Sequence, residues 1–237
     1  MAGYRAFVSL AGATVLSTTG TRFSAIAIPW LVLTTTGSPV LTGLAGFAEM
    51  LPYVVAKALG GPLIDRSGAR RISVWCDLLS TVAVCLVPLL FWAGLLSIWV
   101  LLPAVALIGV LRAPSDAAKQ ALVPAVAALE RVPMERVTGA IGASDRLAGT
   151  LGAASAGALI ALLGPAPALL ANAVAFLLSA LVIAIGVPKT EISTEVKAAG
   201  SYRAELGEGW VVLRRDPVLV SMVLQRLLFV PCVIWSA

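Results

Sequence analysis

The sequence has no histidine, few charged residues and only three cysteines. Histidine is a common general base and metal ligand, so its absence argues against many enzyme sites. Charged residues make up 12% of the chain and hydrophobic residues 59%, whereas a soluble domain carries about 25% charged residues. Such a chain cannot cover a water-facing surface with charge. The composition argues against a soluble enzyme, a nucleic-acid-binding domain or a disordered tail, and it predicts an all-α integral membrane protein.

The spacing of the three cysteines indicates neither a disulfide nor a metal site. Cys76 and Cys85 lie nine positions apart in one apolar stretch, which is about 13 Å of helical rise and too far for a disulfide. Cys232 lies in another apolar stretch, and none of the three has the spacing of zinc ligands. We interpret them as small buried apolar residues, and we expect no metal and no cofactor.

Six apolar stretches are long enough to cross a bilayer, which takes about 20 helical residues. A seventh begins near Pro217 and runs to Ala237. Between the sixth and seventh lies a polar linker, whose second part, 202–215, has the pattern of an amphipathic helix on the membrane surface. We therefore predict a six-helix bundle over 1–188, a cytoplasmic linker over 189–216 and a seventh helix over 217–237. The six predicted spans are 7–34, 41–59, 72–92, 99–122, 138–163 and 168–187.

The connections between these stretches alternate in charge. Those at 34–39, 93–97 and 164–167 carry none, whereas those at 65–71 and 130–136 carry several basic residues. Basic loops stay in the cytoplasm. The pattern predicts a multi-pass protein of the plasma (inner) membrane, with its N-terminus in the cytoplasm.

The segment between the second and third stretches reads Gly61-Pro62-Leu63-Ile64-Asp65-Arg66-Ser67-Gly68-Ala69-Arg70-Arg71. It resembles the signature loop of the major facilitator superfamily, G-x-L-x-D-R-x-G-R-[RK]-[RK]. The matching residues are Gly61, Leu63, Asp65, Arg66, Gly68, Arg70 and Arg71. Ala69 departs from the pattern, where arginine is usual. The resemblance implies a conformational latch between two six-helix halves, with Asp65 facing a helix end in the second half.

Other motifs resemble a drug-efflux branch of that superfamily, which contains macrolide and siderophore exporters driven by proton exchange. They include Leu51-Pro52-Tyr53, the run from Ala117 to Pro124 and the run from Glu208 to Pro217. Arg112 matches the membrane arginine of the family's second motif. The exporters' helix-five motif, glycine followed by proline, is not intact, because Gly149 precedes Thr150. By this resemblance the proton gradient drives transport.

Charges inside apolar spans mark functional sites, because an ion is costly in hydrocarbon. Glu49 lies near the midplane of the second stretch, where a carboxyl can take and release a proton as a cavity opens to each side. We predict that Glu49 couples protons to transport with Arg112 as its partner, the alternative being a fixed structural ion pair. Together with Arg22, they are also the candidates for the substrate cavity.

The remaining charges receive structural interpretations. Asp77, Asp145 and Arg146 lie near the inner surface and are predicted to support the signature loop. Lys57 and Lys119 are predicted to extend toward the inner headgroups. Asp116 is one helical turn from Arg112, so we expect local pairing there.

These observations favour a secondary transporter that exports a hydrophobic or amphipathic small molecule by alternating access. Its expected partners are the lipid bilayer, the substrate and a missing C-terminal half, since we read the chain as a truncated half. One alternative is a non-transporting half-protein or membrane scaffold. Another is a half-size transporter that works as a dimer with a second copy. No nucleophile–base set or phosphate-binding loop supports an enzyme.

Overall fold

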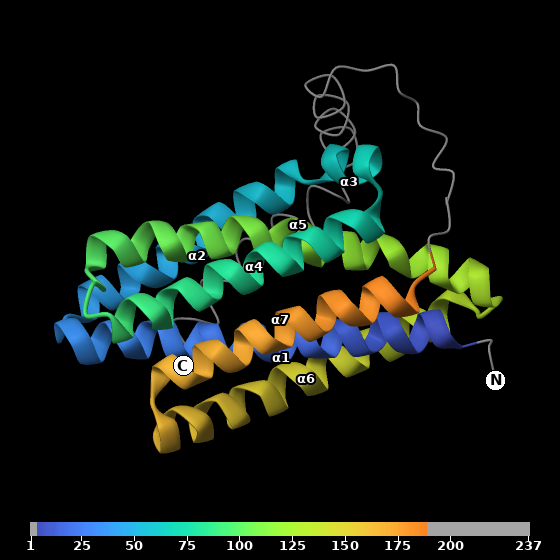
Figure 1. Cartoon of the computed structure of the whole chain (residues 1–237). Coiled ribbons are helices and arrows are strands. Elements are labelled where there is room, and N and C mark those ends of the chain that lie inside the picture. Colours follow the sequence, from blue (N-terminus) through green and yellow to red (C-terminus); the bar gives the residue numbers. More distant parts are fainter. Residues whose placement is uncertain (1–3, 189–237) are drawn as a thin grey trace, which may run out of the picture. The chain divides into compact units, whose positions relative to one another are not determined.

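The computed structural model describes residues 4–188, all of which lie within the first of the chain's two compact units, Met1–Thr194. The predicted linker and seventh helix, with Cys232, lie outside the described residues. Long helices running side by side make up the described part (Figure 1). These are α1 (Arg5–Thr36), α2 (Pro39–Leu59), α4 (Ala69–Trp92), α5 (Ile98–Glu130), α6 (Met134–Leu163) and α7 (Pro165–Gly186), with a short α3 (Gly61–Ser67) between α2 and α4.

Glycine and proline set the helix boundaries. Gly37 ends α1 in the left-handed conformation, with φ 66°, and Pro39 begins α2. Between them, the Ser38 hydroxyl accepts a hydrogen bond from the N–H of Leu41. This Gly-Ser-Pro sequence is a helix stop followed at once by a capped helix start, which is why the predicted limits at 34 and 41 lie within two residues of the observed ones.

Five of the described helices are long and apolar enough to cross a membrane, namely α2, α4, α5, α6 and α7. The helix α1, with 32 residues, is long enough, but its composition does not meet the same requirement. Its middle, from Ser17 to Arg22, is rich in hydroxyl residues and holds an arginine. Since α1 packs against α7 and α6, Ser17 is buried and the three threonines of this stretch are partly buried, whereas Arg22 is exposed.

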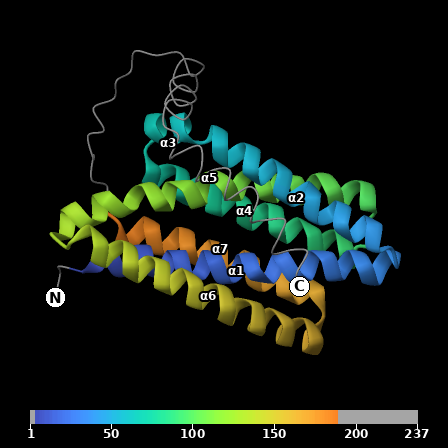
Figure 2. The ribbon, with the colours of Figure 1, turned by 180° about the vertical axis from the view of Figure 1, so that it is seen from behind.

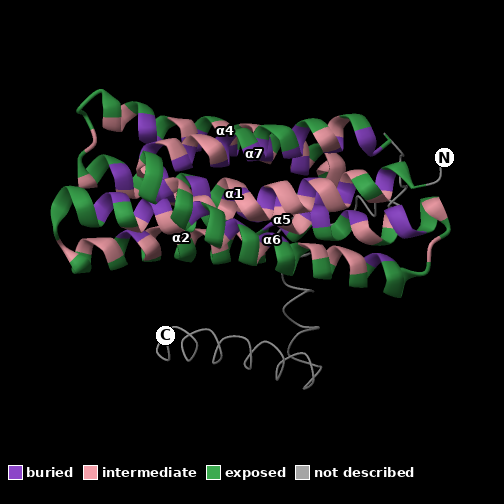
Figure 3. Ribbon diagram, turned by 90° about the horizontal axis from the view of Figure 1, so that it is seen from below, coloured by how far each residue is buried: buried purple, intermediate pink, exposed green. Residues whose placement is uncertain are grey.

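The uncharged connections gather at one end of the bundle (Figure 1), and the opposite end holds the N-terminus, α3 and the turn from α5 to α6. The uncharged connections and the connections that carry basic residues therefore lie at opposite ends of the folded bundle. Seen from behind in Figure 2, α1 runs between α6 and α2. Figure 3 shows buried residues on faces turned to neighbouring helices and exposed residues on the outer faces.

Two clusters of buried apolar side chains form the core. The larger includes Ile28, Val84, Ile108 and Phe176, and the smaller includes Leu10, Leu122 and Ile183 nearer the N-terminal end of α1. Large apolar side chains also cover the outer faces. Such surfaces suit hydrocarbon rather than water as the surrounding solvent.

The N-terminal end of α1 is capped by a distant residue. The Glu130 carboxylate, at the end of α5, accepts hydrogen bonds from the N–H groups of Ala6 (2.7 Å) and Phe7 (3.1 Å). These groups have no acceptor within their own helix. A negative charge at a helix N-terminus is also favoured by the helix dipole. Glu130 thereby links the start of α1 to the end of α5.

Two details differ from the sequence-based expectation. The signature segment is partly helical, because α3 occupies Gly61–Ser67. The helix α5 continues through Pro124 to Glu130, beyond the end of the predicted span at residue 122. Proline lacks only one backbone donor, and neighbouring helices can stabilise a membrane helix that contains one.

Candidate functional site

The helices α2 and α5 meet closely at Gly109. A Cβ atom there would collide with the backbone carbonyl oxygen of Glu49 and would lie 3.4 Å from the backbone nitrogen of Tyr53. Glycine is therefore the residue that permits this contact. Because Arg112 lies one turn after Gly109, the close approach sets its side chain beside the same face of α2.

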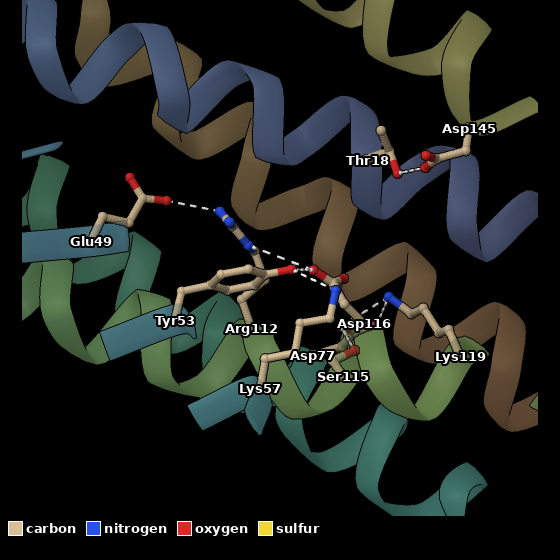
Figure 4. A network of polar contacts seen from close by, with 10 residues as sticks. All are labelled: Thr18, Glu49, Tyr53, Lys57, Asp77, Arg112, Ser115, Asp116, Lys119 and Asp145. Carbon is tan, nitrogen blue, oxygen red and sulfur yellow. Dashed lines mark hydrogen bonds and ion pairs between the residues drawn. The ribbon is translucent and has the colours of Figure 1, made fainter. Parts of the chain in front are cut away.

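Glu49 and Arg112 form an ion pair, with 2.8 Å between Oε1 of Glu49 and Nη1 of Arg112 (Figure 4). Both side chains are largely shielded, at 12% and 13% exposed. Glu49 lies ten residues after the start of α2, or about 15 Å along the axis, which is half the thickness of the hydrocarbon layer. The structure thus brings together the two residues for which we predicted a partnership; their role in coupling stays a prediction.

Tyr53 and Asp116 extend this pair into a ladder between the two helices. The Arg112 guanidinium lies over the Tyr53 ring, 4.5 Å from its centroid, a favourable cation–π arrangement. The Tyr53 hydroxyl donates to Oδ2 of Asp116 at 3.1 Å, and the same oxygen lies 3.8 Å from Nε of Arg112. Asp116 does pair locally with Arg112, as expected, but at a longer distance than Glu49.

Lys57 completes the ladder. Its Nζ donates to the Tyr53 hydroxyl at 3.2 Å and lies 5.5 Å from the ring centroid. We define the α2–α5 ladder as Glu49, Tyr53, Lys57, Arg112 and Asp116. It holds two carboxylates and two cations, so their formal charges cancel, and Lys57 has a partner within the bundle in addition to any headgroup.

A second polar cluster surrounds Asp77 on α4. Its carboxylate lies 2.9 Å from Nζ of Lys119 and accepts hydrogen bonds from the hydroxyls of Ser115 and Ser179. Asp77 is completely buried and Lys119 is 4% exposed. The prediction that Lys119 reaches the headgroups is therefore wrong. The cluster joins α4, α5 and α7, and the proposed support of the signature loop by Asp77 stays a prediction.

The other predicted residues lie apart from the ladder. Arg22 lies on α1, against Gly149 and Gly152 of α6, and the structure does not bring it to Glu49 or Arg112. Asp145 accepts a short hydrogen bond from the Thr18 hydroxyl of α1. Asp145 and Arg146 are both exposed on α6.

The signature segment forms α3 and the start of α4. Gly68 has φ 84°, a conformation that favours glycine, so the chain can turn sharply there. Gly61, Leu63, Asp65 and Arg66 are exposed on α3, and Arg71 is exposed on α4. Arg70 differs from its neighbours. Its Nε donates to the carbonyl of Val187 (2.7 Å) and its Nη2 to that of Ala184 (2.6 Å), so it caps the C-terminal end of α7.

Reasoning from the sequence missed three features of the structure. Tyr53 was noted only within a family motif, and the pairing of Asp77 with Lys119 joins residues 42 positions apart. Arg70 was interpreted only as part of the signature segment. A hint was available for Tyr53, because Glu49, Tyr53 and Lys57 repeat at four-residue spacing along one helix face.

Comparison with known proteins shows what the chain is similar to. The chain is 34% identical over 175 residues to the multidrug efflux pump Tap of Mycobacterium tuberculosis, covering 73% of this chain and 42% of that protein. It is 28% identical over 214 residues to Tap of Mycolicibacterium fortuitum, covering 86% of this chain and 51% of that protein. The chain thus spans about half the length of the curated relatives it matches. No solved structure matches it.

The family model of the Major Facilitator Superfamily matches residues 10–237. That match covers nearly the whole chain, including the signature segment on α3 and α4 and the arginine at position 112. With the all-helical bundle and the charged ladder inside it, the match leads to one conclusion: the chain belongs to the Major Facilitator Superfamily and is a multi-pass membrane protein.

Proposed function

We propose that the chain is the N-terminal bundle of a proton-coupled exporter of hydrophobic or amphipathic small molecules. The observation that carries this proposal is the Glu49–Arg112 ion pair, shielded at mid-membrane depth between α2 and α5. The similarity to pumps named for multidrug efflux supports the direction and the broad substrate class.

The ion pair supplies a way to couple proton binding to movement. An ionised Glu49 attracts Arg112 strongly, because the protein shields the pair from water. A proton on Glu49 cancels that attraction, and α2 and α5 are then held by the weaker contacts around Gly109 and Tyr53. Binding and release of the proton therefore bias the relative position of the two helices, as alternating access requires.

The bundle is proposed to work with a second bundle. Large apolar side chains on α2, among them Phe47, Leu51 and Val54, are exposed, and only Ala45 of this helix is buried. We propose the C-terminal half as the partner, in the plasma membrane and with the N-terminus in the cytoplasm. The mass of the intact protein from native membranes would separate this arrangement from a dimer of two short chains.

The proposal is tested by replacing Glu49 with glutamine, which is similar in shape but cannot carry the negative charge. In inverted membrane vesicles with an imposed pH gradient, uptake of a fluorescent lipophilic dye should be lost in E49Q. Exchange of dye without a gradient should remain, since it does not need the proton.

The matched control is E135Q, which removes an exposed carboxylate at the start of α6, away from the ladder, and should retain proton-driven uptake. If E49Q accumulates dye like the unaltered protein, Glu49 does not couple protons and the pair is structural. If no variant, including the unaltered protein, moves dye in either assay, the alternative of a non-transporting membrane scaffold is favoured.

A further inference from the structure

One atom of the α2–α5 ladder is unsatisfied. Nε of Arg112 is buried and has no hydrogen-bond partner in the described part of the chain. It points toward Oδ2 of Asp116, 3.8 Å away, beyond hydrogen-bond distance. A buried N–H without an acceptor is unfavourable, so this contact is incomplete in the state that the structure represents.

The geometry points to Asp116 as a second counter-ion of Arg112. We propose that the guanidinium shifts from Glu49 to Asp116 when Glu49 is neutralised by a proton. This inference rests on the proposed function, and it assigns to Asp116 the role of a positioning residue. Asp116 would then stabilise the protonated state of the ladder, in which Arg112 would otherwise have no counter-ion.

The surroundings suit such a shift. Arg112, which lies over the Tyr53 ring, stays there in either position, because the cation–π contact acts on the flat face of the guanidinium. Asp116 is on the same helix one turn away, and its Oδ2 already lies 3.8 Å from Nε of Arg112, so the exchange needs only a small movement of the guanidinium and can precede any displacement of α2 against α5. The Tyr53 hydroxyl keeps its contact with Lys57 throughout.

The charges around Glu49 agree with this assignment. The helix α2 packs against α1, α3 and α5. The described acids and bases in the ladder beside Glu49 are Arg112 and Asp116 from α5, and Tyr53 and Lys57 from α2 itself. Arg22 of α1 contacts α6 instead. Asp116 is thus the acid placed to take over Arg112 when Glu49 no longer carries charge.

The first test measures thermal unfolding of the purified protein in detergent, with D116N made in the unaltered protein and in E49Q, which mimics a protonated Glu49. The expected fall in Tm caused by D116N is about 2–4 °C greater in the E49Q background, where Asp116 is the main counter-ion. A merely structural Asp116 would give equal falls in both backgrounds, and that result would overturn the inference. D145N is the control and should have the same effect in both.

A second measurement separates this inference from the proposed function. In inverted vesicles D116N should reduce proton-driven dye uptake several-fold while exchange without a gradient continues, and D116E should restore uptake because it keeps the charge. If E49Q abolishes uptake and D116N leaves it unchanged, the inference fails and the proposed coupling by Glu49 stands. If E49Q itself retains uptake, it is the proposed coupling that fails, and the unfolding comparison alone decides whether Asp116 replaces Glu49.

Discussion

At the scale of single residues, the charged side chains of the α2–α5 ladder and those around Asp77 form two separate clusters that differ in burial. The α2–α5 ladder is partly accessible, with Asp116 26% exposed, whereas Asp77 and Lys119 are almost completely enclosed. We propose that the less enclosed ladder is the cluster whose protonation changes during a transport cycle. An enclosed ion pair whose carboxylate accepts further hydrogen bonds is better suited to hold helices together.

The Asp77 cluster leads to a prediction about stability. Replacing Asp77 with alanine leaves the Lys119 ammonium buried without a counter-ion, which should cost about 3–5 kcal/mol of the free energy of unfolding. Replacing both members with apolar residues, as in D77L/K119M, should cost much less, because no charge remains to be compensated. Thermal unfolding in detergent measures both. Equal losses in the single and double variants would show that the hydroxyl contacts of Ser115 and Ser179, and not the charges, carry the stability.

At the scale of the helices, the contact between α2 and α5 depends on the absence of one side chain. Substitution G109A adds a methyl group where the backbone carbonyl of Glu49 lies. We expect it to push the helices apart, to cost about 1–3 kcal/mol in the free energy of unfolding and to lower proton-driven dye uptake by separating Glu49 from Arg112.

The matched control is G139A, on α6. A Cβ at that position meets no atom within 4 Å, and alanine is the better helix former. This variant should therefore be neutral or slightly stabilising and should transport normally. Normal stability and transport in G109A would mean that α2 and α5 can part by the width of a methyl group without consequence.

The helix positions were largely predictable, because apolar stretches and Gly–Pro boundaries are local features. The predicted spans 41–59 and 138–163 end at the same residues as α2 and α6. The pairings between helices were harder to predict from the sequence. Glu49 and Arg112 could be proposed as partners because both charges lie at mid-membrane depth. The burial of Lys119 could not be predicted, because it depends on which face of α5 turns toward Asp77. That orientation is decided by the packing of several helices together.

At the scale of the whole molecule, the two ends of the bundle differ in charge. The sequence pattern predicts that the end with the N-terminus and α3 is cytoplasmic. Single cysteines introduced as L95C, in the α4–α5 turn, and as E135C, at the start of α6, test this in a protein whose own cysteines are replaced by alanine. A membrane-impermeant maleimide should label L95C in intact cells and E135C only after permeabilisation. The reverse pattern would invert the proposed orientation.

The cap on α1 has a consequence for biosynthesis. Glu130 lies 124 positions after Ala6, whose N–H it accepts. At about 5–20 residues per second, a ribosome needs about 6–25 s to make the intervening chain. During that interval the first helix has already been made, but the acceptor of its leading N–H groups has not. Until α5 is complete, water at the membrane surface is the acceptor for these N–H groups. Their permanent hydrogen bonds to Glu130 can form only after that residue has been made.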